Sequence, residues 1–362
     1  MKLKNGLRVL RRDEQEAQIG SDPVVAVTLR LEHPSEFNVL QLLERDQTPG
    51  NLRSELERLG GDRERVDHLL HKLAAAGLLQ ISSRNRSAEL QVDPQRRDIL
   101  APEAETRSLA GGNGWRQMAR RGDQCVSVYG LGRTGAHIAL GLAAAGVGKL
   151  QLHDPDPVTP RDRGQLFGPQ HLGLERAAAV AQIIAGQSLN CQICTSGRWS
   201  RPQAAVLVDY EVADPNRSAF LSAHGIAHLS VVVGELSISC GPWVPNAAGP
   251  CLRCVRLWAV EKDPCWPGLA TQRFARSAVA ARGEDSSLAA TAGAVAVGEV
   301  LQGLGGVRPF TAGRALVLRQ PSYAIHWHDV DVHPKCGDHS PQPRRSRKLS
   351  PPPPAIALPP AL

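Results

Sequence analysis

The sequence lacks the features that mark membrane and secreted proteins. It contains no uncharged apolar run of about eighteen residues, the length that crosses a bilayer. Its first residues, MKLKNGLRVLRRDEQE, have no apolar core of the kind found in signal peptides. We therefore expect a cytoplasmic protein that makes no contact with a membrane.

Cysteine is too sparse for a small domain held together by disulfides. The 362 residues include eight cysteines, which are spread over the last two thirds of the chain. In a reducing compartment, two cysteines separated by two residues point to a metal or to redox chemistry before they point to a disulfide.

An excess of positive charge is missing from the first hundred residues, where sixteen Lys and Arg face sixteen Asp and Glu. The whole chain has a formal net charge of +7. Four cations lie together near the end of the sequence, at Arg344, Arg345, Arg347 and Lys348. Because nucleic-acid binding needs a cationic face toward the phosphates, this distribution argues against a nucleic-acid partner.

Residues 1–100 combine strand-like and helix-like patterns. Extended runs, GLRVLRR and VVAVTLRL, precede three helical segments and a short closing strand, LLQISS. Pro49 suits the first turn of the second helix, Asp62 can cap the third, and Gly77 ends it. This order predicts a winged-helix domain over residues 1–100.

The rest of the chain divides into three parts. Residues 101–122 lose apolar periodicity, which predicts a linker. Strands alternate with helices over residues 123–339, which predicts an α/β domain with a layered sheet. Residues 340–362 are rich in proline and cannot bury a core, so we expect a disordered tail.

A glycine-rich turn lies near the start of the α/β domain. Gly130, Gly132 and Gly135 form G-x-G-x-x-G between an apolar run and a helical segment. Such a turn brings backbone N–H groups and a positive helix end close to a phosphate. Asp154 ends the next strand, where a carboxylate can bind ribose hydroxyls, and Asp156 follows it. The pattern predicts a nucleotide site and leaves NAD, FAD and ATP open.

Two cysteines in GPCLRC are candidates for a structural zinc site. Cys251 and Cys254 can present two thiolates to one zinc ion, which needs two further ligands. The later stretch HPKCGDH offers His333 and Cys336, with Asp338 and His339 beside them. The alternative is two buried thiols and a surface cluster of histidines.

Four pieces of the chain carry a family resemblance when taken in order: GLGRTG, GVGKLQLHDPDPV, GPCLRC and AATAGAVAVGEVLQGLGG. Over about residues 124–336 the chain resembles the ThiF/MoeB family of ubiquitin-activating-type adenylyltransferases. The resemblance implies a Rossmann-like ThiF-type fold and a homodimer. The front domain, with AQIGSDPVVAVTLR before its helices, resembles the winged helix that recognises precursor peptides in ThiF-like proteins of azole-forming TOMM/RiPP pathways.

The family resemblance implies a reaction and roles for particular residues. Family members bind MgATP on the glycine-rich turn, and a peptide carboxylate attacks the α-phosphate to give an acyl-adenylate and pyrophosphate. Cationic side chains and Mg²⁺ stabilise that transition state. By this resemblance Gly130, Gly132 and Gly135 hold the nucleotide, Asp154 binds the ribose, and Arg176 stands for a catalytic lysine. Asp209 is the candidate magnesium ligand, with Glu211 and Asp214 as alternatives.

The chain also departs from the family pattern. Arg133 replaces a glycine beside the expected phosphate, and Gly164 or Gln165 stands where an arginine of the family's NLxRQ motif is expected. Arg176 keeps the charge of the lysine but changes its geometry. In HPKCGDH, Asp338 occupies the place of a cysteine.

These departures favour a protein that holds its ligands over one that activates them. The leading hypothesis is a ThiF-like protein that binds a nucleotide and a precursor peptide and presents the peptide to a partner such as a YcaO-type cyclodehydratase. The alternative is an active ATP-dependent adenylyltransferase acting on a peptide carboxylate. A DNA-binding regulator and an NAD-dependent dehydrogenase fit the sequence less well.

Overall fold

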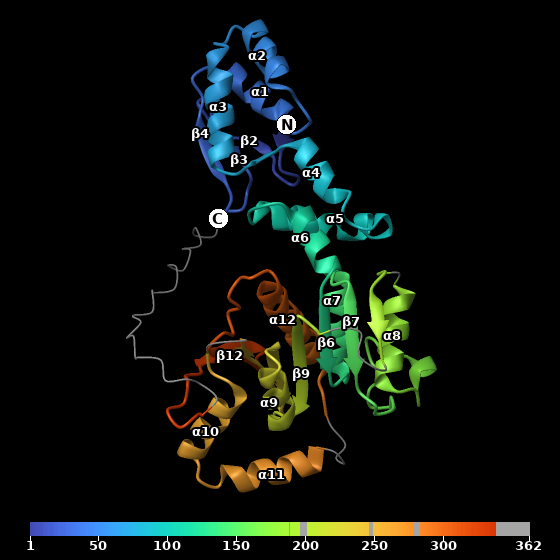
Figure 1. Ribbon diagram of the computed structural model, residues 1–362. Coiled ribbons are helices and arrows are strands. Elements are labelled where there is room, and N and C mark those ends of the chain that lie inside the picture. The colour runs from blue at the N-terminus through green and yellow to red at the C-terminus, as the bar shows by residue number, and fades with distance from the viewer. Residues whose placement is uncertain (188, 196–200, 246–248, 278–282, 338–362) are drawn as a thin grey trace.

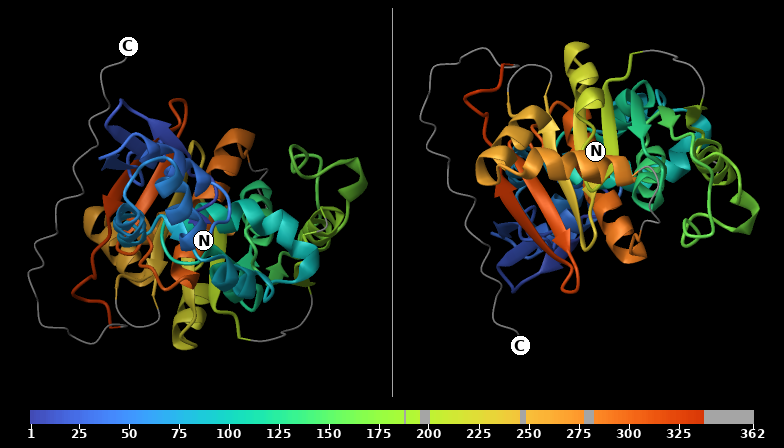
Figure 2. Two further views of the ribbon diagram at one scale, coloured as in Figure 1. Left: turned by 90° about the horizontal axis from the view of Figure 1, so that it is seen from above. Right: turned by 90° about the horizontal axis from the view of Figure 1, so that it is seen from below.

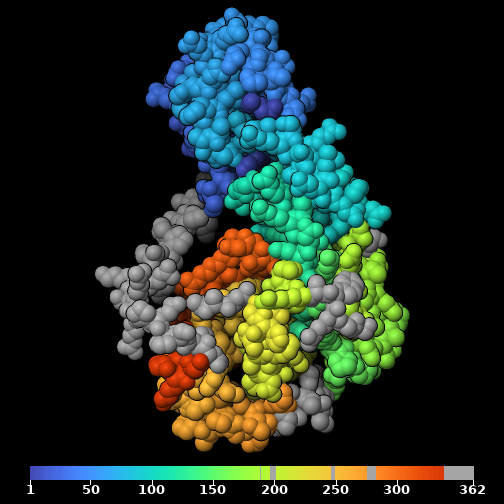
Figure 3. All heavy atoms as spheres, viewed as in Figure 1, coloured from blue at the N-terminus to red at the C-terminus, as the bar shows by residue number. Residues whose placement is uncertain are grey.

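The computed structural model describes residues 1–187, 189–195, 201–245, 249–277 and 283–337. Within these ranges, a small N-terminal lobe is joined through a helical segment to a larger lobe built on one sheet (Figures 1 and 3). The predicted tail, with Asp338 and His339, lies outside the described residues.

The N-terminal lobe has the strands and three helices expected of a winged helix. Its helices are α1 (Ser35–Leu42), α2 (Pro49–Arg58) and α3 (Glu64–Ala75). One sheet contains β2 (Val9–Arg11), β3 (Glu16–Ile19) and β4 (Val27–Arg30), and a second pairs β1 (Lys2–Leu3) with β5 (Leu79–Gln80).

Apolar side chains at helical spacing close the core of this lobe. Leu52, Leu56, Leu69 and Leu73 are buried together, and each buried leucine contributes roughly 2 kcal/mol. Thr48 caps α2 by accepting from the Asn51 N–H, as predicted. Asp62 accepts from the Glu64 N–H, but it lies one position before the N-cap of α3, which is Arg63 and has no side-chain cap. The closing strand is shorter than predicted, because α4 (Ser82–Glu89) begins within LLQISS.

The stretch predicted to be an aperiodic linker, residues 101–122, is helical. It contains the second half of α5 (Pro94–Leu109) and all of α6 (Gly114–Gly122). These helices share a small core with α4, made of Ala88, Val92, Leu100, Ala104, Trp115 and Met118. The apolar residues are spread over three short helices, so no single segment shows a strong periodic pattern.

The larger lobe is built on an eight-stranded sheet in the order β13-β12-β11-β10-β9-β6-β7-β8. Five neighbouring strands are parallel: β6 (Cys125–Tyr129), β7 (Lys149–His153), β8 (Gln192–Cys194), β9 (Ala204–Tyr210) and β10 (Ala227–Val233). The other three are antiparallel: β11 (Ser237–Val244), β12 (Arg314–Arg319) and β13 (Ala324–Asp329). The predicted α/β layered fold is confirmed.

Helices cover both faces of this sheet (Figures 1 and 2). Alternate residues of β9 show the two sides: Val206 and Val208 belong to the main core, and Ala205 and Leu207 to a second cluster. The main core includes residues of α7 (Arg133–Ala144), α8 (Arg176–Gly186) and α12 (Ser286–Leu304). On the opposite side lie α9 (Pro215–Ala223), α10 (Leu252–Lys262) and α11 (Trp266–Ser277). A short 3-10 turn spans Pro169–His171.

Within the part of the chain that the structure describes, one helix, α12, has the length and composition of a membrane-crossing segment. Its residues Leu288, Ala292, Ala296 and Val300 are part of the main core of the sheet. The buried Glu299 carboxylate of this helix accepts hydrogen bonds from the backbone N–H and the hydroxyl of Thr311. These contacts make α12 a core helix of the larger lobe.

Candidate functional site

The glycine-rich turn connects β6 to α7 at the carboxyl end of the parallel strands. Gly130 has a φ of +82°, a left-handed conformation that favours glycine. A Cβ on Gly130 would overlap the Val208 carbonyl oxygen, and one on Gly135 would overlap the Gly130 carbonyl oxygen. Two of the three predicted glycines are therefore required by close approaches of the backbone.

Asp154 holds this turn in place from the end of β7. It is buried, and its carboxylate accepts from the N–H groups of Leu131, at 2.7 Å, and Asp156, at 3.1 Å. Burial raises the pKa of Asp154, while the two backbone donors and the nearby Arg176 oppose that shift. The predicted ribose ligand thus also fixes the conformation of the turn.

Arg176, the predicted catalytic cation, is surrounded by carboxylates. Its guanidinium lies 3.0 Å from Asp162, 3.4 Å from Asp156 and 3.6 Å from Asp154. Burial works to lower the pKa of Arg176, but the bond to Asp162 and the charge of Asp154 outweigh it, so the pKa is raised. Three carboxylates surround the single positive charge of Arg176, so its attraction for a phosphate is weakened.

Asp162 was not among the predicted site residues. Burial works to raise its pKa, but hydrogen bonds from the N–H and hydroxyl of Thr159 and from Arg176 leave the pKa lowered. No sequence motif indicates this pairing, because fourteen positions separate Asp162 from Arg176 and only the fold brings them together.

The magnesium candidates lie in the last residues of β9 and directly after it, at the same sheet edge. Asp209 accepts from the Asp214 N–H, and Arg217 lies 3.5 Å from Asp209 and 3.7 Å from Asp214. Burial raises the pKa of Asp209. Glu211 has a φ of +62° and lines a cavity next to these residues. One guanidinium thus lies beside two aspartates that could bind a cation and offsets part of their negative charge.

A residue that the sequence analysis did not single out lies directly on the glycine-rich turn. The Glu284 carboxylate accepts from the N–H groups of Arg133 and Thr134, at 3.2 and 2.8 Å. It also accepts from the Thr134 hydroxyl and, at 2.9 Å, from the Tyr210 hydroxyl. The N-terminus of α7 therefore binds an anionic group, as the motif predicts, and in this structure the group belongs to the chain itself.

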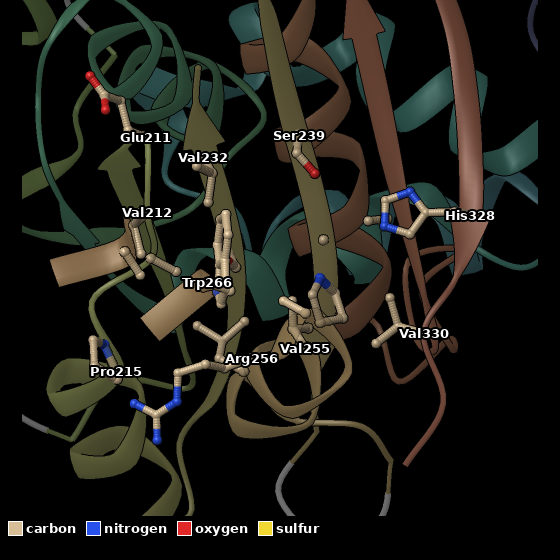
Figure 4. Close-up of a pocket in the computed structure, with 18 residues that line it drawn as sticks. Glu211, Val212, Pro215, Val232, Ser239, Val255, Arg256, Trp266, His328 and Val330 are labelled. Atoms are coloured by element: carbon tan, nitrogen blue, oxygen red, sulfur yellow. The ribbon is translucent and has the colours of Figure 1, made fainter. Parts of the chain in front are cut away.

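A largely apolar cavity of about 220 Å³ lies on the side of the sheet covered by α10 and α11. Figure 4 shows Trp266 of α11 near Val232 of β10, while Ser239 of β11 and His328 of β13 lie across the cavity. Glu211 and Val212, which follow β9, contribute to its lining. This cavity meets the sheet edge at which the magnesium candidates lie.

Three of the four predicted zinc ligands come together. The sulfur atoms of Cys251, Cys254 and Cys336 all lie within 4.8 Å of one another, and all three side chains are buried. Burial, with the neighbouring thiols, raises the pKa of Cys251 to about 12. Three converging sulfur donors suit a soft divalent ion such as zinc, whose charge would stabilise the thiolates.

His333 lies outside this group of three. Its Nδ1 accepts from the Lys335 N–H at 3.1 Å, and its Nε2 lies 3.1 Å from the Glu261 carboxylate. The ring packs edge-on against Trp258. Because the imidazole makes these contacts, the structure supplies three sulfur ligands within the described residues, and the other two candidates, Asp338 and His339, are outside them.

Comparisons with known proteins agree with the resemblance seen in the sequence. The ThiF family model matches residues 109–208. Escherichia coli MccB, solved with ATP, has a TM-score of 0.67 at 12% identity, covering 94% of this chain and 99% of MccB. The microcin C7 biosynthetic enzyme MccB, solved in complex with N-formylated MccA, has a TM-score of 0.68, also at 12% identity, covering 94% of this chain and 99% of MccB.

A third similar structure is PaaA, with a TM-score of 0.69 at 16% identity, covering 90% of this chain and 98% of PaaA. No curated protein sequence matches the chain. Structural similarity at these identities concerns the fold. It extends over the N-terminal lobe as well as the large sheet, and the match to the ThiF family model over residues 109–208 bears out the predicted resemblance to the ThiF/MoeB family.

Proposed function

From this similarity to the ThiF family, we propose that the protein binds a nucleotide and a precursor peptide and recruits the peptide to a partner modifying enzyme. In this proposal the adenylylation machinery is partly degraded. The observation that carries it is the enclosure of Arg176 by three carboxylates, beside a glycine-rich turn whose anion-binding geometry is intact.

The nucleotide part of the proposal rests on the turn from Gly130 to Gly135. Its N–H groups at Arg133 and Thr134 point at an oxyanion, which is the arrangement that binds phosphates. Gly130 and Gly135 allow the tight backbone approaches that form this turn, and Asp154 and Asp156 follow the next strand. Similar structures include MccB solved with ATP, which makes ATP the preferred nucleotide here.

The proposed loss of adenylylation activity is inferred from the positions of two cations, Arg176 and Arg217. Phosphoryl transfer needs positive charge directed at the transition state, and a missing cation costs roughly a factor of 10³ in rate. Arg176 is directed at Asp162 and Asp154, and Arg217 lies against Asp209, where Mg²⁺ would bind. Nucleotide binding in the ground state depends less on these two positive charges, so it can persist when they are paired with carboxylates.

Two measurements on the full chain test this combination. ATP should raise the melting temperature, while ATP–pyrophosphate exchange with a cognate peptide should stay at background. Exchange at the rate of an active adenylyltransferase would instead support the alternative, an enzyme that activates a peptide carboxylate. The cavity beside Glu211 favours that alternative, because it could hold the apolar end of a peptide near Asp209.

The peptide part rests on the N-terminal lobe. Its three-stranded sheet ends at β4, to which an extended peptide can add as a further strand. MccB has been solved with the peptide MccA, and its similarity covers this lobe. Titrating the full chain with the cognate precursor, and with a scrambled precursor as control, tests the proposal: equal heats from both would contradict it.

The remaining parts of the proposal follow from the family. A YcaO-type cyclodehydratase is the proposed partner, the protein is a cytoplasmic homodimer, and a structural zinc is held by Cys251, Cys254 and Cys336. When bound, this zinc would connect the start of α10 to the segment after β13. Magnesium would accompany ATP at Asp209 only if Arg217 moved away.

A further inference from the structure

Arg133, which replaces a glycine of the family, also holds residues 284–286 against the glycine-rich turn. The Arg133 guanidinium donates to the Glu284 carbonyl oxygen and the Ser286 hydroxyl, both at 2.9 Å. It also donates to the carbonyl oxygens of Arg161, at 2.8 Å, and Arg163, at 2.7 Å. These contacts fix residues 284–286 beside the first turn of α7.

The Glu284 side chain uses this position to occupy the anion site. Both carboxylate oxygens are bound, one by the Arg133 N–H and the Tyr210 hydroxyl, and the other by the N–H and hydroxyl of Thr134. The Tyr210 hydroxyl packs so closely on Gly132 that a Cβ there would overlap it. The space above Gly132, which phosphate oxygens would enter, is therefore filled by Tyr210 and Glu284.

We propose that Glu284 is an internal competitor of the nucleotide phosphates, held in place by Arg133 and Tyr210, so that a nucleotide binds only when this carboxylate leaves the turn. This inference rests on the proposed nucleotide binding. It adds a regulatory contact to the same site and gives a role to Arg133, the residue that replaces a glycine of the family.

For electrostatic reasons, the Glu284 carboxylate and a nucleotide phosphate cannot occupy the turn at the same time. A carboxylate and a phosphate cannot share the same N–H donors, and two anions at that distance repel each other strongly away from bulk water. A site that is open for only a fraction of the time binds its ligand more weakly by that fraction. Nucleotide affinity is thus set by how often Glu284 is released.

The chain offers variants that test this without removing the turn. Glu284→Ala empties the anion site, Glu284→Gln removes its charge at nearly the same size, and Tyr210→Phe removes one donor to the carboxylate. Asp285, whose side chain accepts from the Leu288 N–H at the start of α12, is retained in all three. Glu14→Gln, an exposed residue of the N-terminal lobe, is the control for the change in net charge.

The first measurement is ATP binding to each full-length variant by isothermal titration. Glu284→Ala is expected to bind ATP about tenfold or more tightly than the unaltered chain, because the competing state is removed. Glu284→Gln and Tyr210→Phe should show smaller gains, and Glu14→Gln should show none. Equal affinities across the set would overturn the competition and leave the proposed nucleotide binding intact.

The second measurement needs no nucleotide. Hydrogen exchange of the Arg133 and Thr134 amides should be slow in the unaltered chain and faster in Glu284→Ala, because the first amides of a helix have no intrahelical acceptor. If these amides exchange at the same rate in both proteins, the contact is not formed and the inference fails. If the contact is present but no variant binds ATP, the proposed nucleotide binding is wrong and the competition falls with it.

Discussion

At the scale of single residues, the most informative group is the ion cluster around Arg176. The family resemblance predicts a catalytic cation at this position, and the structure surrounds Arg176 with Asp154, Asp156 and Asp162. Asp154 and Asp162 are both buried, but Asp162 has two oxygens in contact, at 3.0 and 3.1 Å, whereas Asp154 lies 3.6 Å away and the Asp156 side chain is 62% exposed. The cluster therefore supports the local fold mainly through one buried pair.

Replacing Asp162 by Asn should lower the free energy of unfolding at pH 7 by about 2–3 kcal/mol, the size of a lost hydrogen bond to a charged group. Because the pKa of Asp162 is lowered in the folded state, its contribution is present above the pKa of the unfolded chain. It is lost as the pH falls through the folded pKa.

Urea unfolding of both proteins between pH 7 and acidic pH measures this, and the two stabilities should converge on acidification. Asp156→Asn is the matched control, since it removes a carboxylate from the same Arg176 at an exposed position. It should cost less than about 1 kcal/mol. A cost at Asp162 no larger than at Asp156 would contradict the assignment of the buried pair.

At the scale of elements, helices α5 and α6 form a close-packed connection between the two lobes. A Cβ on Gly114 would overlap the carbonyl oxygen of Ala104, so the start of α6 crosses directly over α5. Lys4 and Asn5 of the N-terminal lobe donate to Ser108 and Glu105 of α5, each at 2.6 Å. The segment predicted as a linker thus contributes to the contact between the lobes.

Gly114→Ala should destabilise the protein by about 1–3 kcal/mol, because an added methyl group cannot fit without separating the two helices. Gly298 of α12 is the control: no atom lies within 4 Å of its added Cβ. Gly298→Ala should be neutral or should stabilise by up to about 1 kcal/mol, since alanine favours a helix. Thermal unfolding of both variants tests the packing, and equal effects would contradict it.

At the scale of the whole molecule, the three-cysteine cluster joins parts of the chain that are far apart in sequence. Cys251 and Cys336 are separated by 85 positions, yet their sulfur atoms lie 3.7 Å apart. The cluster packs on the same face of the sheet as Ala205 and Leu207 of β9. A metal bound there would restrain the C-terminal segment against this face.

We expect the purified protein to hold about one zinc ion per chain, as a structural site of this donor type does. Cys336→Ser should lose most of the metal and lower the melting temperature by about 5 °C or more, because metal binding contributes to folding stability. Cys265, exposed and outside the cluster, provides the control. Metal analysis that finds no zinc in the unaltered chain, or equal loss in Cys265→Ser, would contradict this prediction.

Local patterns in the sequence predicted most of the fold. The apolar runs of β6 and β9, the glycine-rich turn and the Thr48 cap of α2 depend on neighbouring residues, so they can be recognised from short segments. The helices of residues 101–122 were missed because their core is shared among α4, α5 and α6. The partners of the site were missed for a similar reason, since Asp162, Tyr210 and Glu284 reach it from separate segments.

The sequence by itself predicted a nucleotide-type turn, two pairs of zinc ligands (Cys251 with Cys254, and His333 with Cys336) and a ThiF-like order of elements, because each of these depends on residue types at short spacing. Only the tertiary structure decided what the charged residues do. It placed Arg176 among carboxylates, Arg217 beside Asp209 and Glu284 on the turn. The effect of a charged side chain on a ligand depends on the charges that lie near it in space, and positions along the chain do not reveal which residues those are.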